Sequence, residues 1–315
     1  MQFQTVTGSV AVEQVRLADA HAHLWIKPPA GIADDCRYEL NDEARIQAEL
    51  VDFRAAGGTT LVDCQPDGCG RDATKLVKLS QATGLQVTAS TGFHLKRYYP
   101  PEYWLWTATT DAATAYFIEE LTVGMKETGP GVRATVIKVA YDGTVDGQQQ
   151  VLMQAAAIAA RQTGATILFH TEQGRNVEAL PPFFTGRGVD AAQLYMCHVD
   201  KRPDFGLHRE LARAGVLLGY DTFARPKYDP EHNVWPLLKQ MVADGLEKSV
   251  VIGLDMAATA MWQHYGGGPG MLTLPRDIAP RLHAEGLSDE VIRQLTAQNI
   301  AERLVWQTPR SKDAA

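Results

Sequence analysis

Residues 148–170, QQQVLMQAAAIAARQTGATILFH, contain one complete helix-then-strand unit. Residues 148–163 are rich in Ala and Gln and predict a helix, and Gly164 follows as a typical helix-ending residue. Residues 166–169 form a short apolar run that predicts a buried strand. His170 comes directly after that run, so the unit places a titratable side chain at the carboxyl end of a strand.

The same alternation extends over the whole chain. Helices are predicted over 42–56, 72–83, 111–126, 148–163, 205–214, 234–244 and 289–305, and several precede a glycine: Gly57, Gly84, Gly164, Gly215 and Gly245. Strands are predicted over 15–20, 59–63, 86–91, 135–139, 166–169, 193–197, 216–220 and 250–254. Eight strands that alternate with helices predict a (β/α)8 TIM barrel that spans 1–315 as a single domain. An open doubly wound sheet would need a glycine-rich loop after its first strand, where this sequence has His21-Ala22-His23.

Composition excludes several classes of protein. The 315 residues are 45% hydrophobic and 21% charged, which is typical of a globular protein rather than a disordered one. The net charge of −7 argues against nucleic acid or an anionic membrane as a partner. No apolar run is long enough to span a membrane, and no secretory signal is visible. The four cysteines form no C-x-x-C pair, so we expect reduced thiols and a cytoplasmic location.

Polar residues recur at the strand ends, where a barrel of this class has its active site. His21 and His23 stand two residues apart, so both imidazoles can face the same way. Lys138 lies within an aliphatic strand, where an unpartnered ammonium group is costly to bury. Each such residue alone is more often structural, but their joint placement is hard to attribute to packing. The set is His21, His23, Lys138, His170, His198 and Asp255.

This set resembles the binuclear metal site of the phosphotriesterase-related branch of the amidohydrolase superfamily. The resemblance covers nearly the whole chain. It departs at 21–23, which read His-Ala-His where the family more often has His-Glu-His. Other segments that look like family motifs are Gly70-Arg71-Asp72, Thr91-Gly92-Phe93, Ile137-Lys138-Val139, His198-Val199-Asp200-Lys201 and Gln298-Asn299-Ile300-Ala301.

The resemblance implies a metal-dependent ester or lactone hydrolase with two divalent ions. Lys138 would be N-carboxylated and would bridge the two ions. Nitrogen and oxygen ligands of this kind most often bind Zn²⁺, and they also suit Mn²⁺ or Co²⁺. A hydroxide shared by the ions would attack the substrate, and Asp255 would be the catalytic residue that accepts its proton. Asp200 would orient a ligand or relay protons, or else simply cap a loop. The more buried ion would be held by His21, His23 and Asp255, and the more exposed ion by His170 and His198.

Three loops bear on the substrate, which is expected to be a small molecule. Arg225, Lys227 and Tyr228 follow the seventh strand and offer the cations and hydroxyl that a phosphate dianion needs. With Tyr265 after the eighth strand, these loops look like those of phospho-furanose lactonases, which implies a pentonic 1,4-lactone carrying a 5-phosphate. Either Tyr98 or Tyr99, after the third strand, would contact the lactone ring. The alternative is that these loops are plain surface.

Other functions stay open at this point. The substrate could be an unphosphorylated sugar lactone, an acyl homoserine lactone or a phosphotriester, and a barrel without catalysis is the remaining possibility. The aromatic run 103–106, YWLW, could supply an apolar pocket, a packed loop or a contact in a homodimer.

Overall fold

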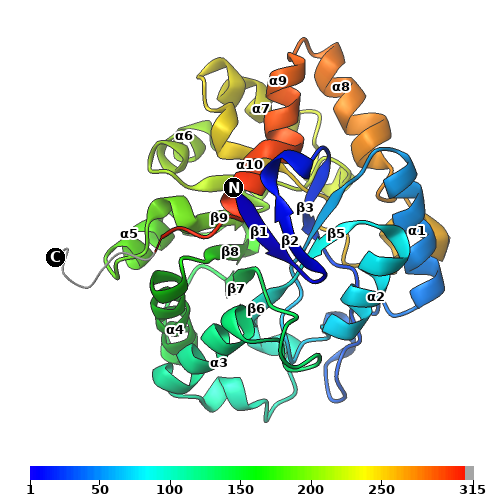
Figure 1. The fold of residues 1–315 in the computed structure, drawn as a ribbon. Coiled ribbons are helices and arrows are strands. Elements are labelled where there is room, and N and C mark those ends of the chain that lie inside the picture. The colour runs from blue at the N-terminus through cyan, green and yellow to red at the C-terminus, as the bar shows by residue number, and fades with distance from the viewer. Residues whose placement is uncertain (309–315) are drawn as a thin grey trace.

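A ring of parallel strands forms the centre of the computed structural model, which describes residues 1–308 (Figure 1). Every pairing within this ring is parallel, and the strands follow one another around it in chain order. The strands are β3 (Ala18–Ala22), β4 (Thr60–Asp63), β5 (Gln86–Thr88), β6 (Ser90–Phe93), β7 (Val136–Tyr141), β8 (Thr166–Thr171), β9 (Leu194–Cys197), β10 (Leu217–Tyr220) and β11 (Val250–Ile252). The predicted (β/α)8 barrel is therefore confirmed.

One predicted strand is two in the structure. The run 86–91 was expected to be continuous, but β5 pairs with β4 and β6 pairs with β7. Ala89 lies between the two segments, and its carbonyl accepts a hydrogen bond from the Thr135 amide at 2.8 Å. The third strand position of the ring is thus made of two segments, of which β5 pairs with the strand before it and β6 with the strand after it.

The first and last strands meet through residues of β3 and the segment after β11. The Asp255 amide donates to the His21 carbonyl at 2.8 Å. The buried Asp19 carboxylate accepts hydrogen bonds from the amides of His21 at 3.1 Å and Leu254 at 2.9 Å. These bonds close the ring and bring the two ends of the barrel sequence into one site.

Helices surround the ring on its outside (Figure 1). Asp42 and Asp72 cap the first two helices by accepting backbone amide hydrogen bonds, and Gly84 and Gly164 end α2 and α4 with positive φ. The predicted helix over 289–305 is interrupted by a π-helical turn at Gln294–Gln298. The sequence patterning did not indicate α5 or α8. The helices are α1 (Glu43–Ala55), α2 (Ala73–Thr83), α3 (Thr110–Thr122), α4 (Gly147–Thr163), α5 (Leu180–Thr185), α6 (Phe205–Arg213), α7 (Val234–Ala243), α8 (Ala279–Ala284), α9 (Asp289–Arg293) and α10 (Asn299–Arg303).

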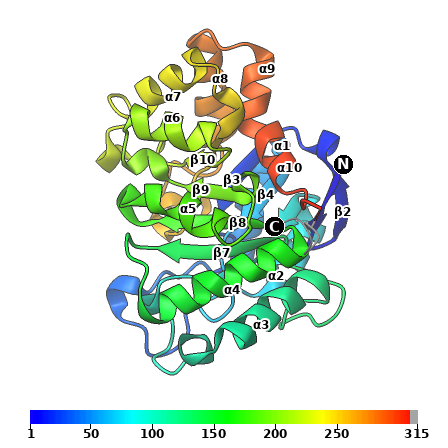
Figure 2. The same cartoon turned by 90° about the vertical axis from the view of Figure 1, so that its left-hand side faces the viewer.

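An N-terminal hairpin covers one end of the barrel. Strands β1 (Gln2–Thr5) and β2 (Gly8–Ala11) pair antiparallel, and the Val6 amide bonds the Val87 carbonyl at 2.8 Å. The arrow of β7 points away from this hairpin, toward the opposite end of the molecule (Figure 2). The hairpin was not predicted, and it leaves the carboxyl ends of the strands free to form a site.

Along the strands, successive side chains point alternately into two apolar layers, one inside the ring and one beneath the helices. Val136 and Leu168 belong to the cluster inside the ring, whereas Ile137 and Phe169 pack in the layer beneath the helices. Lys138 has the same alternation as Val136, so its side chain enters the ring. Within the described residues, no helix is long and apolar enough to cross a membrane.

Candidate active site

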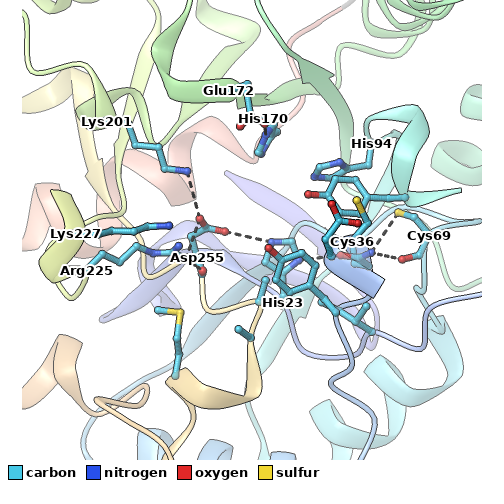
Figure 3. A pocket seen from close by; sticks show the side chains of 18 of the residues that line it. His23, Cys36, Cys69, His94, His170, Glu172, Lys201, Arg225, Lys227 and Asp255 are labelled. Atoms are coloured by element: carbon cyan, nitrogen blue, oxygen red, sulfur yellow. Dashed lines mark hydrogen bonds and ion pairs between the residues drawn. The ribbon is translucent and has the colours of Figure 1, made fainter. Parts of the chain in front are cut away.

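The carboxyl ends of the strands open into a cavity of about 810 Å³. His23, His170 and Asp255 line it, and they come from the segment after β3, from β8 and from the segment after β11. Figure 3 shows His23, His170 and His94 on different sides of the opening, with Asp255 between His23 and the side chains of Lys201, Arg225 and Lys227. Strand ends that are far apart in the sequence thus share one pocket.

His21, His23 and Asp255 form a compact group of possible metal ligands. Their ligand atoms lie within 4.8 Å of one another, and Asp255 Oδ1 is 3.5 Å from Nε2 of each histidine. A register irregularity in β3 between Asp19 and Ala22 gives His21 its inward direction, because Ala20 packs inside the ring and Ala22 outside it.

The charges around this group favour a cation. Burial alone would lower the pKa of His21, but the nearby Cys64, Asp255 and Asp221 side chains raise it to about 10. Burial also opposes ionisation of Asp255, yet Arg225 and His21 hold its pKa well below the usual range. His21 Nε2 is buried without a hydrogen-bond partner. A carboxylate and imidazole nitrogens in this arrangement fit a divalent ion such as Zn²⁺.

His170 and His198 form a second group. His198 Nε2 lies 2.8 Å from His170 Nδ1, and burial lowers the pKa of His170 to about 4, so its ring is neutral at pH 7. His170 Nε2 lies 3.2 Å from Glu172 Oε2, and this hydrogen bond lowers the pKa of Glu172 to about 2. Burial also lowers the pKa of His198 well below its usual value, and two neutral imidazoles with facing nitrogens are suited to share a metal ion.

Lys138 is fully buried at the centre of the ring, and its Nζ has no hydrogen-bond partner. A positive charge there would act on members of both groups, because it opposes the rise in the pKa of His21 and adds to the lowering of the pKa of His170 by burial. Gly92 faces it on β6, where a Cβ atom would lie 2.0 Å from the Lys138 carbonyl oxygen. An orphaned amine between two sets of possible ligands fits the anionic, bridging form that the resemblance implies for Lys138.

Asp221 joins the two groups beneath the pocket. Its Oδ2 lies 2.6 Å from His21 Nδ1 and accepts the backbone amide of His198 at 3.0 Å. Asp200 in turn accepts the amides of Asp221 and Thr222 and the Thr222 hydroxyl. Burial and the charge of Asp221 raise the pKa of Asp200 to about 7. Asp200 thus contacts the backbone of Asp221, whose side chain contacts His21 and the backbone of His198, and its role stays a prediction. The sequence analysis assigned no role to Asp221, although its position directly after β10 is a signal that could have found it.

A cluster of cations stands beside Asp255. Arg225 Nη2 lies 3.0 Å from Asp255 Oδ2 and also donates to the Asp255 carbonyl, and Lys201 Nζ is 3.9 Å from the same Oδ2. Both ammonium groups of Lys201 and Lys227 lie over the Tyr228 ring, at 5.6 and 4.9 Å from its centroid. All four side chains line the pocket. Lys201 was not predicted as part of the substrate site.

The predicted tyrosines separate into two kinds. Tyr98 lines the pocket, whereas Tyr99 is buried and its hydroxyl accepts the His94 amide at 2.8 Å. Tyr265 also lies off the pocket wall, because its hydroxyl accepts the Asp42 amide at 2.8 Å. Tyr98 is therefore the one of the pair that faces the site, and we leave Tyr99 and Tyr265 out of the proposed substrate contacts.

Two further segments have roles that patterning could not show. Several residues of the segment 26–38 form part of the pocket wall, where the ring centroids of Tyr38 and Tyr98 lie 6.1 Å apart. Of the aromatic run 103–106, Leu105 and Trp106 are buried within the chain, and Trp104 is 37% exposed. That run is mainly a packed loop, and the homodimer stays a prediction.

The model of the phosphotriesterase family matches residues 1–304. The chain belongs to the phosphotriesterase family. The predicted family is therefore confirmed, and with it the prediction that the chain is a hydrolase.

Individual relatives agree with this assignment. A phospho-furanose lactonase of Mycoplasmopsis synoviae is 28% identical over 330 residues, an alignment that covers 98% of this chain and 93% of the relative. The crystal structure of an amidohydrolase from Mycoplasma synoviae has a TM-score of 0.90 at 26% identity, covering 99% of this chain and 94% of that one. A lactonase from Listeria monocytogenes has a TM-score of 0.91 at 24% identity, covering 98% and 100%, and supports the fold.

Proposed function

We propose that this chain is a binuclear metal-dependent lactonase that opens a phosphorylated sugar 1,4-lactone, of the pentonolactone 5-phosphate type. The observation that carries the proposal is the cluster of Lys201, Arg225, Lys227 and Tyr228 directly beside Asp255. The name of the Mycoplasmopsis synoviae relative supports the same substrate class.

Two sets of side chains would hold the ions, most suitably Zn²⁺, with Mn²⁺ or Co²⁺ as alternatives. His21, His23 and Asp255 would hold one ion, His170 and His198 the other, and N-carboxylated Lys138 would bridge them. When bound, such ions activate water at neutral pH and polarise the oxygen of the bond under attack.

The basic cluster would bind the phosphate. Arg225 offers a planar set of N–H donors, Lys201 and Lys227 add charge, and Tyr228 adds a hydroxyl. Lys201, Arg225 and Lys227 lie on one side of Asp255 (Figure 3). A phosphate held there would place the rest of a small lactone over the strand ends, where Tyr98 lines the pocket beside His94.

Asp255 would carry the proton. Its Oδ1 faces the two histidines, whereas its Oδ2 faces Arg225 and Lys201 on the pocket side. Oδ2 would accept the proton of the attacking water and then pass it to the alkoxide that leaves when the ring opens. The carboxylate is ionised before the reaction, because its pKa is held low.

The test is hydrolysis of pentono-1,4-lactones, each with and without its 5-phosphate, by the metal-loaded protein. A large advantage in kcat/KM for the phosphorylated form supports the proposal. Equal turnover of both forms, or turnover only of esters without phosphate, would remove the basic cluster from the function and leave the metal-dependent hydrolase.

The bridging lysine has its own test. Lys138→Ala should bind less metal and lose turnover, because both ions share that ligand. Short carboxylic acids added to this variant should restore part of its activity. Full activity without them would contradict the bridging role.

A further inference from the structure

Glu172 and Arg97 form a chain of polar contacts behind His170. His170 Nε2 lies 3.2 Å from Glu172 Oε2, and Arg97 Nη2 lies 2.9 Å from the same oxygen. The Arg97 guanidinium also stands 5.1 Å from the centroid of the Tyr98 ring. Figure 3 shows Glu172 beside His170, on the side away from the pocket centre.

This contact decides which nitrogen of His170 can bind a metal. A carboxylate has acceptors only, so the hydrogen of the neutral imidazole must be on Nε2. The lone pair is then on Nδ1, which is the atom that faces His198 Nε2 at 2.8 Å. A carboxylate behind a ligating histidine also makes the imidazole a stronger donor.

We propose that Glu172 is a positioning residue for the more exposed metal ion, and that Arg97 holds Glu172 in place. The inference rests on the proposed binuclear centre and adds a pair of residues to it. Glu172 fixes the tautomer and the ring orientation of His170. Arg97 belongs to the loop after β6, so the wall that carries Tyr98 is tied to the same ligand.

The arrangement also separates Arg97 from the phosphate cluster. Arg97 lines the pocket as Arg225 does, and each guanidinium is paired with a carboxylate: Arg97 with Glu172, which lies behind His170, and Arg225 with Asp255. Arg225 belongs to the segment after β10, whereas Arg97 belongs to the loop after β6. Arg97 therefore serves the metal ligand, and the cations beside Asp255 serve the substrate.

The test measures Zn²⁺ binding to the metal-free full-length protein by competition with a chelating dye. Wild type should bind two ions per chain. Glu172→Gln should bind the first ion as wild type does and the second about 10- to 100-fold more weakly. Arg97→Gln should weaken the second ion by a smaller factor, because the carboxylate remains. Glu178→Gln is the matched control, since this exposed residue of the same segment pairs only with Arg202 among the described contacts.

The possible outcomes distinguish a failure of the role proposed for Glu172 from a failure of the proposed binuclear centre. Two ions with unchanged dissociation constants in Glu172→Gln would overturn the inference and leave the binuclear centre intact. Equal weakening in Glu178→Gln would show general loosening of the segment and would also overturn it. A wild type without a second ion would overturn both. Arg97→Gln, which leaves His170 and Glu172 in place, provides the test if Glu172→Gln does not fold.

Discussion

His21 and Asp221 are joined by a contact of 2.6 Å between Nδ1 and Oδ2, and both side chains are buried. They lie 200 positions apart in the sequence, on the first and seventh positions of the strand ring. Because Nδ1 is engaged, Nε2 is the nitrogen that faces Asp255. The contact leaves His21 with one free nitrogen, directed at the group of possible ligands.

Asp221→Asn should weaken binding of the ion held by His21 about 10- to 100-fold, because the amide is a poorer partner for Nδ1–H than the carboxylate. Titration of the metal-free protein with Zn²⁺ measures the effect. Asp229→Asn changes an exposed aspartate of the following loop, which pairs with His232, and should bind metal as wild type does. Unaltered affinity in Asp221→Asn would contradict the assigned role.

Arg225→Ala should raise KM for a phosphorylated lactone about 100-fold, because a charged hydrogen bond of about 2–3 kcal/mol is lost. KM for the unphosphorylated lactone should change little, and the ratio of the two KM values is the measurement. Tyr265→Phe is a control, because its hydroxyl bonds the Asp42 backbone rather than lining the pocket. A ratio that Arg225→Ala does not change would place the phosphate elsewhere.

Gly92→Ala should destabilise the protein by more than about 2 kcal/mol. The backbone at Gly92 has a φ of +96°, and a Cβ would lie 2.0 Å from the Lys138 carbonyl oxygen. The measurement is the free energy of unfolding in urea. Gly286→Ala has a similar φ of +87° with nothing within 4 Å, so it isolates the cost of backbone conformation. Equal losses in the two variants would rule out the close approach as a cause.

His208 should make stability depend on pH. Its Nδ1 lies 2.8 Å from the Tyr220 hydroxyl and its Nε2 3.0 Å from the Arg202 carbonyl, and burial lowers its pKa to about 4. An unfolded histidine has a pKa of about 6.5, so the unfolded chain takes up the proton first and stability falls as the pH drops from about 6.5 toward 4. Between pH 8 and pH 5 this single group should cost about 2 kcal/mol.

His208→Gln tests that dependence. The variant should be less stable than wild type at pH 8, because it loses buried hydrogen bonds, but its decline toward pH 5 should be shallower by about 2 kcal/mol. Urea unfolding at both pH values gives the difference. His283→Gln changes an exposed histidine and should decline as wild type does. Parallel declines for wild type and His208→Gln would refute the assignment.

The strand ends were predictable because hydrophobic periodicity and helix-ending glycines are local features of the sequence. Lys138 could be placed within a strand from the apolar run around it, His170 at a strand end from the run after Gly164, and Arg225 and Lys227 from their position after a strand. Their roles as ligands remain predictions. The split of 86–91 into two strands was not predictable, because it depends on which neighbour each half meets in the ring.

Other features depend on side chains that meet only in the folded chain. Tyr98 and Tyr99 are adjacent and identical in type, yet one lines the pocket and the other bonds the His94 amide, because the 3-10 turn at Lys96–Tyr98 directs them differently. Tyr265 meets Asp42 across 223 positions. No local pattern carries such information.

The sequence by itself determined the alternation of strands and helices, the barrel, and the polar residues at its carboxyl end. Local hydrophobic periodicity and helix-ending glycines are enough for that. Only the tertiary structure decided which of those residues meet. Ring closure brings Asp255 to His21 and His23, and the turns after β8 and β10 bring Glu172 to His170 and Asp221 to His21. These contacts depend on the curvature of the closed sheet, which is a property of all its strands together.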